Sequence, residues 1–163
     1  MRPGQRIVVI SGGTASGKSA LARALIAGLD LSWQLLQADD FIGPAFRELA
    51  GKGEWDPDGR KICRRMLNDA AASWVERVKV SLLVEGFFKE AGEIDRLLGA
   101  VGAPAGVGPS LILHILVSEA EARRRRPYEV PRFAEVHPKA ITFDSDGKNP
   151  TQVLEWARGM LGA

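Results

Sequence analysis

Cysteine is nearly absent from this sequence, and its scarcity restricts both the chemistry and the compartment. Among 163 residues, only Cys63 carries a thiol. A single thiol excludes an intramolecular disulfide and a cysteine-ligated zinc cluster. Because structural disulfides belong to oxidising compartments, their exclusion favours a reducing, intracellular location.

Long apolar runs and an excess of one charge are absent as well. The first apolar run, Ile7–Ile10, is too short for the core of a signal peptide or for a membrane span. Lys and Arg number 22 against 20 Asp and Glu, and the basic residues gather mainly around Arg123–Arg126. This charge distribution does not favour a nucleic-acid surface, and the short apolar run does not favour a membrane partner. We therefore expect a soluble cytoplasmic protein, monomeric or homodimeric, without nucleic-acid or membrane partners.

Short apolar runs alternate along the chain with helical patterns. The runs are Ile7–Ile10, Trp33–Leu36, Leu82–Val84, Leu111–Val117 and Ala140–Phe143. Continuous apolar runs are typical of parallel strands whose two faces are both covered by helices. The alternation therefore predicts an α/β fold, and the length and 45% hydrophobic content predict one domain over residues 1–163.

Apolar stripes predict three of the helices. The first stripe, in a helix expected to end near Asp30, is Leu21, Leu25 and Leu29. The second repeats every four residues before the third strand, at Ile62, Met66, Ala70, Trp74 and Val78. Asn149 and Pro150 predict the cap and first turn of a last helix. Its apolar face would be Val153, Trp156, Ala157 and Met160.

A glycine-rich segment between the first predicted strand and helix fits the phosphate-binding pattern G-x-x-x-x-G-K-[ST]. Glycines let successive backbone N–H groups face phosphates, and the helix N-terminus adds a positive dipole. Lys18 would reach the terminal phosphates of ATP, and Ser19 would ligate Mg²⁺. The expected ATP contacts are Gly12, Gly13, Thr14, Ala15, Ser16, Gly17, Lys18, Ser19 and Ala20. The alternative is a glycine-rich turn before a core helix.

Carboxylates follow the second and third predicted strands. Asp39 and Asp40 end the second strand and Glu85 ends the third, which places them beside the phosphate loop in a doubly wound sheet. Asp39, with Asp40 as the second candidate, would orient an acceptor hydroxyl and accept its proton. Glu85 would hold Mg²⁺ or its water shell. The alternatives are a turn or capping role for the aspartates and a solvated strand end for Glu85.

Arginines and one tryptophan supply further candidates. Arg123–Arg126 either stabilise a helix end through its dipole or belong to a lid over about residues 123–139 that offers guanidinium groups to the transferred phosphoryl. Which of the four points inward is open, and Arg124 is our candidate. Trp55 and Asp56 would stack on a flat ring and accept hydrogen bonds from sugar hydroxyls. The alternative for Trp55 is simple coverage of the core.

Several of these segments, taken in order, resemble the nicotinamide riboside kinases among the uridine-kinase-like P-loop kinases. The segments are Ile10–Ser19, Gln37–Phe41, Trp55–Asp56, Leu83–Phe88 and Ala122–Arg126. The resemblance implies ATP and Mg²⁺ as cofactors, and transfer of the γ-phosphoryl to the 5′-hydroxyl of a ribonucleoside. It also implies a three-layer P-loop fold, with a five-stranded parallel sheet flanked by helices and a short arginine-bearing lid.

The same resemblance assigns roles at the substrate sites. Asp39 would contact the acceptor hydroxyl, Trp55 would stack on the base, Asp56 would bind the ribose hydroxyls, and Asp40 and Phe41 would complete the substrate pocket. Lys148, in the loop after the last predicted strand, would lie near adenine.

An ATP-dependent small-molecule kinase with a nucleoside-like acceptor, nicotinamide riboside among the candidates, is therefore the leading hypothesis. A phosphotransferase that acts on another alcohol, such as an antibiotic, would share the same core. A nucleotide-dependent switch is the other alternative, because Asp56–Gly59 and Asp144–Gly147 imitate a D-x-x-G motif. The sequence has no N-K-x-D motif to read guanine.

Overall fold

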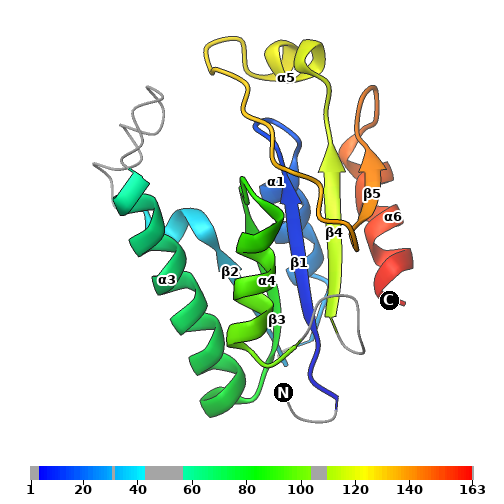
Figure 1. The fold of residues 1–163 in the computed structure, drawn as a ribbon. Helices are drawn as coiled ribbons and strands as arrows, with labels where there is room; N and C mark the ends of the chain where they lie inside the picture. Colours follow the sequence, from blue (N-terminus) through cyan, green and yellow to red (C-terminus); the bar gives the residue numbers. More distant parts are fainter. Residues whose placement is uncertain (1–3, 31, 43–56, 104–109, 163) are drawn as a thin grey trace.

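A computed structural model describes residues 4–30, 32–42, 57–103 and 110–162. Its strands form one sheet in the order β2-β3-β1-β4-β5, and every pairing in it is parallel (Figure 1). The strands are β1 (Ile7–Gly12), β2 (Trp33–Gln37), β3 (Ser81–Gly86), β4 (Ser110–Leu116) and β5 (Ile141–Asp144). This arrangement confirms the predicted α/β fold with a five-stranded parallel sheet.

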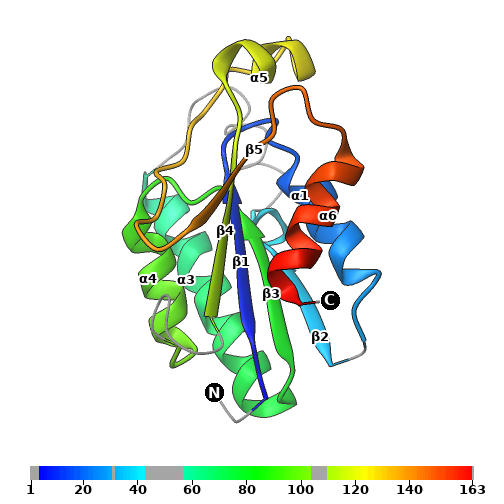
Figure 2. The same ribbon diagram turned by 90° about the vertical axis from the view of Figure 1, so that its right-hand side faces the viewer.

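Helices cover both faces of the sheet (Figure 2). One face packs against α1 (Lys18–Ile26) and α6 (Pro150–Leu161), and the other against α3 (Pro57–Ser73) and α4 (Ala91–Ala100). Residues of β1 alternate between the two cores: Ile7 and Val9 face α3 and α4, whereas Val8 and Ile10 face α1 and α6. All four are fully buried, which explains why β1 reads as a continuous apolar run.

The predicted buried stripe of α3 is wrong by one residue. Ile62 and Met66 are half exposed, and Val78 is 53% exposed. The buried stripe runs instead through Cys63, Leu67, Ala71 and Val75, which continue into the π-helix η2 (Trp74–Val78). Two apolar rows with the same four-residue spacing lie side by side on this helix, and packing against α4 selects the second.

Leu67→Ala should destabilise the protein by about 2–5 kcal/mol, because Leu67 is 1% exposed and its truncation leaves a cavity in the core. Ile62→Ala, on the exposed row of the same helix, should stay within about 0.5 kcal/mol of the wild type. Urea unfolding of both variants measures the difference. A larger loss for Ile62→Ala than for Leu67→Ala would show that the row through Ile62 is the buried one.

The ends of α1 and α6 differ slightly from expectation. α1 ends at Ile26 rather than near Asp30, because the chain turns at Ala27 and Gly28, and the Asp30 carboxylate accepts the N–H of Ser32 at 2.8 Å. The predicted start of α6 is confirmed: the Asn149 side chain accepts from Gln152, whose own side chain accepts from the Asn149 N–H.

The apolar face of α6 is confirmed at Val153 and Ala157, which are buried, while Met160 is 40% exposed and Leu161 is buried in its place. Among the helices that the structure describes, none is both long and apolar enough to cross a membrane.

The carboxyl ends of the strands meet at one edge of the sheet. The glycine-rich loop after β1, the short 3-10 helix η1 (Ala38–Phe41) after β2, and Glu85 near the end of β3 lie at this edge. The helix α5 (Glu119–Arg125) follows β4 and stands beyond the edge (Figures 1 and 2). Open parallel sheets bind ligands at this edge. The binding crevice lies outside the carboxyl ends of the strands, at the point where the strand order reverses.

Candidate active site

The loop between β1 and α1 has the backbone of a phosphate cradle. Ala15 and Gly17 adopt positive φ angles of 61° and 89°. At Gly12 a Cβ atom would lie 2.6 Å from the Ile115 carbonyl oxygen and 2.7 Å from Ser16 Oγ, so the close approach of β4 requires glycine there. Alternating conformations of this kind turn successive N–H groups toward one side.

The start of α1 is suited to an anion. Gly17 is the N-cap and offers no side chain, and the first turn contains no acidic residue, so no side chain of this turn competes with an anion for the helix dipole and its N–H groups. Lys18 Nζ donates to the Gly13 carbonyl at 3.3 Å, which holds the ammonium group over the loop. Burial lowers the pKa of Lys18, and the carboxylates of Glu85 and Asp39 oppose this effect.

Glu85 is buried beside the loop, at 2% exposure. Its Oε1 accepts from Ser19 Oγ at 3.2 Å and lies 3.9 Å from Lys18 Nζ, while its Oε2 accepts from Gln37 Nε2 at 3.0 Å. The structure thus brings together the predicted pair of Ser19 and Glu85. Gln37 was missed by the sequence analysis, because nothing local to β2 indicates that its side chain orients a glutamate on β3.

The described residues contain no cluster of three or more metal-binding side chains. A cation at this site would therefore need oxygen ligands from a bound nucleotide in addition to the Ser19 hydroxyl. This donor set, a hydroxyl next to a buried carboxylate and a phosphate cradle, fits Mg²⁺, which usually keeps several waters and takes few protein ligands.

A cavity of about 490 Å³ next to the phosphate loop is lined by Lys18, Ser19 and Asp39, and we call it the acceptor cavity. Asp39 is exposed and belongs to η1, which packs against α3. Asp40, also exposed, is not among the lining residues, and Phe41 packs against the core under α3 and α4. Of the predicted acceptor residues that the structure describes, it therefore brings Asp39 to the phosphate loop.

Two further predicted acceptor residues, Trp55 and Asp56, lie outside the described residues. The sequence analysis also missed Arg60 and Arg64 of α3, which line the same cavity. Their four-residue spacing on one helix was the available signal.

The four consecutive arginines differ in what they contact. The side chain of Arg124 is 72% exposed and pairs with Glu121 at 2.6 Å. Arg125 points inward: it donates to the Ala15 carbonyl at 3.1 Å, to Ser145 Oγ at 3.2 Å and to the Ser145 carbonyl at 2.6 Å. The hydrogen bonds from Arg124 and Arg125 lower the pKa of Glu121 to about 2. Arg125 therefore ties the phosphate loop to the loop after β5.

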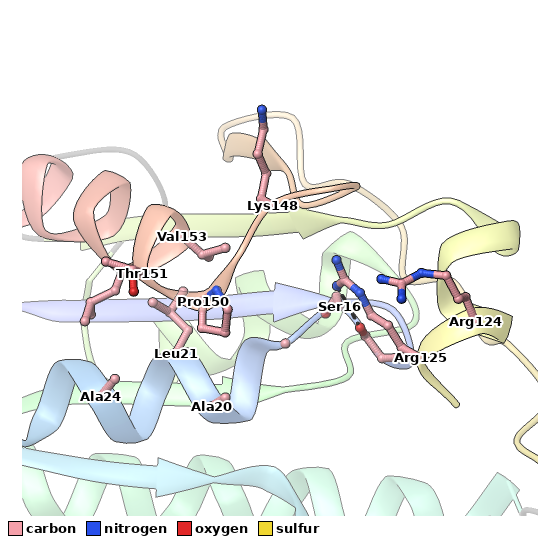
Figure 3. A pocket seen from close by; sticks show the side chains of 13 residues that line it. Ser16, Ala20, Leu21, Ala24, Arg124, Arg125, Lys148, Pro150, Thr151 and Val153 are labelled. Carbon is pink, nitrogen blue, oxygen red and sulfur yellow. Dashed lines mark hydrogen bonds between the residues drawn. The ribbon is translucent and has the colours of Figure 1, made fainter. Parts of the chain in front are cut away.

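A second cavity, of about 460 Å³, is lined by this arginine pair, the first turns of α1 and the start of α6 (Figure 3). Its lining is largely apolar, with Ala20 and Leu21 from α1 and Val153 from α6. Lys148 also lines it, although its side chain extends away from the phosphate loop in Figure 3. The position next to the phosphate loop and the apolar lining fit a nucleotide base.

Arg125→Gln should weaken binding of the ATP analogue AMPPNP by about 10-fold, because it removes charge-assisted hydrogen bonds that hold Ala15 and Ser145 in place. Arg123→Gln is the matched control, since Arg123 is 60% exposed, pairs with Glu119 and lines neither cavity. Calorimetric titration of both variants measures the effect. A similar loss in the two variants would mean that only the overall charge of α5 matters.

The segment from Arg126 to Ala140, which joins α5 to β5 without helix or strand, crosses the phosphate loop. The Thr14 N–H donates to the Arg132 carbonyl at 2.8 Å, and the Arg132 N–H donates to Thr14 Oγ1 at 3.3 Å. Farther along, the Ala91 N–H donates to the Glu135 carboxylate at 2.7 Å, and buried His137 contacts Asp95 at 3.1 Å. No pattern in the sequence indicates these long-range contacts.

Comparison with known protein families gives a match over residues 5–84, to the family described as chloramphenicol phosphotransferase-like protein. The match runs from β1 into β3, includes the phosphate loop and Asp39, and covers just under half of the chain. No curated protein matches the sequence.

Solved structures of kinases share the fold over almost the whole chain. An unliganded sugar kinase from Janibacter sp. HTCC2649 is 18% identical with a TM-score of 0.69, over 98% of this chain and 95% of that one. A gluconokinase from Sinorhizobium meliloti 1021 is 16% identical with a TM-score of 0.65, over 96% and 91%. The Mycobacterium tuberculosis APS kinase CysC, in complex with AMPPNP and APS, is 15% identical with a TM-score of 0.64, over 99% and 100%.

The likeness to these structures concerns the fold, whereas the family match concerns the segment that carries the phosphate loop and Asp39. Both agree with the geometry, in which Lys18, Ser19 and Asp39 line one cavity. The chain has the fold of these kinases, and its residues 5–84 are similar to the chloramphenicol phosphotransferase-like family.

Proposed function

We propose that the protein transfers the γ-phosphoryl group of ATP to a hydroxyl group of a small acceptor molecule held above Asp39. One observation carries this proposal: a single cavity of about 490 Å³ is lined by Lys18 and Ser19 of the phosphate loop and by Asp39 of η1. A carboxylate that shares a cavity with the phosphate loop can reach the hydroxyl that attacks the γ-phosphorus.

In the proposed reaction, the acceptor oxygen forms a bond to the γ-phosphorus as the bond from that phosphorus to the β,γ-bridging oxygen breaks. ADP leaves with the electron pair of the broken bond. Asp39 orients the hydroxyl and accepts its proton. Lys18 exchanges the Gly13 carbonyl for phosphate oxygens and stabilises the charge that develops on them.

Mg²⁺ is part of this proposal. Ser19 would ligate the metal together with the nucleotide phosphates, and Glu85 would hold its water shell, which fits their 3.2 Å contact and the burial of Glu85. When bound, the metal would neutralise phosphate charge.

The arginines of α5 and of the following segment would form the lid over about residues 123–139. Arg124 and Lys148 belong to the proposed ATP site because both line the second cavity, of about 460 Å³, which would hold the nucleotide base. Arg126 and Arg132 line the acceptor cavity and are further candidates for contact with the transferred phosphoryl.

Two classes of acceptor are candidates. A nucleoside-like acceptor, nicotinamide riboside included, is supported by the sequence resemblance and would use Trp55 and Asp56, together with Asp40 and Phe41. An alcohol-bearing antibiotic is the second candidate, because residues 5–84 match the chloramphenicol phosphotransferase-like family.

Acceptor-dependent release of ADP from ATP tests the proposal. The acceptors are nicotinamide riboside, uridine, cytidine, chloramphenicol and gluconate, each paired with a reaction that lacks an acceptor. We expect release above the acceptor-free rate with at least one of them. Absence of such release for every acceptor, together with slow hydrolysis of GTP in preference to ATP, would contradict the proposal and favour a nucleotide-dependent switch.

A further inference from the structure

Two arginines form the part of the acceptor cavity that α3 contributes. Arg60 and Arg64 lie four residues apart, so they project from the same face of the helix, and both line the cavity that contains Asp39. Each guanidinium lies against an aromatic ring from the segment after β3: Arg60 is 5.6 Å from the centre of Phe87, and Arg64 is 4.7 Å from the centre of Phe88. These contacts fix where the guanidinium groups stand.

The two guanidinium groups share the carboxylate of Glu93, and Asp39 also favours the charged form of Arg64. Glu93 accepts from Arg60 Nε at 3.1 Å and from Arg60 Nη2 at 2.9 Å, and it also accepts the Lys89 N–H at 2.8 Å. Arg64 Nε is 3.7 Å from Glu93, which is an ion pair without a hydrogen bond. Because Glu93 also accepts from Arg60 and Lys89, Arg64 shares this carboxylate and makes no hydrogen bond to it through Nε.

Arg64 is also largely removed from water. Its Nη2 donates to the Phe87 carbonyl, and its Nε is buried without a hydrogen-bond partner in the described structure. Burial lowers the pKa of Arg64, but a guanidinium remains charged at neutral pH. A buried charge without a full partner is costly unless a ligand of opposite charge compensates it.

The other charged residues that line this cavity are mostly positive as well. Its cationic lining residues are Lys18, Arg23, Arg60, Arg64, Arg126 and Arg132. The acidic residues in the same described lining are Asp39, which is exposed, and Glu129, which pairs with Arg126 at 2.8 Å. ATP phosphates would face Lys18 on the loop, whereas Arg60 and Arg64 come from α3, which packs against η1 and α4.

We infer that the acceptor carries an oxyanion in addition to its reactive hydroxyl, and that Arg60 and Arg64 bind this group. The inference rests on the proposed function, because it assumes that the acceptor occupies the cavity above Asp39. Guanidinium groups bind carboxylate, phosphate or sulfate through their N–H donors. Hydroxy acids and phosphorylated or sulfated alcohols fit this chemistry, and the inference therefore favours them over the cationic nicotinamide riboside among the proposed acceptors.

The binding test uses the full chain saturated with AMPPNP and Mg²⁺, so that the phosphate loop is already filled. Sulfate and acetate are titrated as anionic probes and glycerol as the neutral probe. We expect saturable binding of at least one anion and none of glycerol. Arg60→Gln and Arg64→Gln should each weaken anion binding by about 10-fold or more, since each removes charge-assisted hydrogen bonds. Arg65→Gln, on the exposed side of the same helix, should leave it unchanged.

The inference is overturned if no anion binds to the saturated wild-type protein, or if both variants bind anions as the wild type does. The wild-type comparison of anions with glycerol does not depend on the folding of any variant. A thermal melt checks that Arg64→Gln, which removes a partly buried side chain, is folded before its titration counts.

A kinetic comparison separates this inference from the proposed function. Gluconate and glucose carry similar hydroxyl groups, and the anionic one should be the better acceptor by about 10-fold or more in kcat/KM. If glucose is phosphorylated as well as gluconate, the anion inference fails while the proposed kinase activity stands. If the saturated protein binds sulfate and yet no acceptor yields ADP, the proposed function fails while the anion site stands.

Discussion

Replacing Lys18 by methionine is expected to slow phosphoryl transfer by roughly 10²–10³-fold, as for the loss of one preorganised group that stabilises developing charge. Lys18 Nζ is held over the phosphate loop by the Gly13 carbonyl and lies 3.9 Å from Glu85, at the junction of the loop with the acceptor cavity. Methionine keeps most of the aliphatic length but removes the charge. Initial rates of ADP release at saturating ATP measure the effect.

Arg77→Met serves as the matched control for Lys18→Met. It also removes one positive charge, but from an exposed position in η2, before β3 begins, and therefore away from the carboxyl edge of the sheet. Its rate should equal that of the wild type. Glu85 keeps its hydrogen bonds from Ser19 and Gln37 in the Lys18→Met variant, so the protein should remain folded, and a thermal melt checks this. A Lys18→Met protein that retains full activity would contradict the role of this residue.

The elements of the fold could be predicted where the sequence pattern itself requires one arrangement. Val8 to Ile10 are apolar at every position because both faces of β1 are covered, and this pattern alone indicates a central parallel strand. α3 is the contrasting case. The rows through Ile62 and through Cys63 have the same spacing, and the packing of the second row against α4 depends on residues far away in the sequence.

In the candidate site, too, the residues set by a local pattern could be predicted, and those set by distant contacts could not. The phosphate loop is a local structure, so its residues could be identified from eight consecutive positions. Asp39 and Glu85 could be placed because both lie at the carboxyl ends of neighbouring parallel strands, which meet at one edge. In contrast, Arg125 is distinguished from Arg124 by contacts with Ala15 and Ser145, which lie 110 and 20 positions away. Consecutive arginines look alike until the helix phase and its neighbours are known.

Asp39→Asn is expected to reduce kcat by about 10²–10⁴-fold, the range for the loss of a general base, while AMPPNP binds as to the wild type. Asparagine keeps the size of the side chain and can still accept a hydrogen bond from a hydroxyl, but it cannot take up the proton. Asp39 lines the acceptor cavity and stands near Lys18 without belonging to the phosphate loop. The measurement is single-turnover transfer with a preferred acceptor, together with an AMPPNP titration.

Asp40→Asn decides between the two neighbouring aspartates. Both carboxylates are exposed in η1, but Asp39 lines the cavity and Asp40 does not, so Asp40→Asn should keep kcat within a few fold of the wild type. Asp69→Asn, on the exposed surface of α3, controls for the loss of one negative charge. A large loss of kcat in Asp40→Asn with little loss in Asp39→Asn would transfer the base to Asp40. Equal, small losses in both variants would mean that the acceptor proton leaves by another route, with transfer driven by phosphate stabilisation and positioning alone.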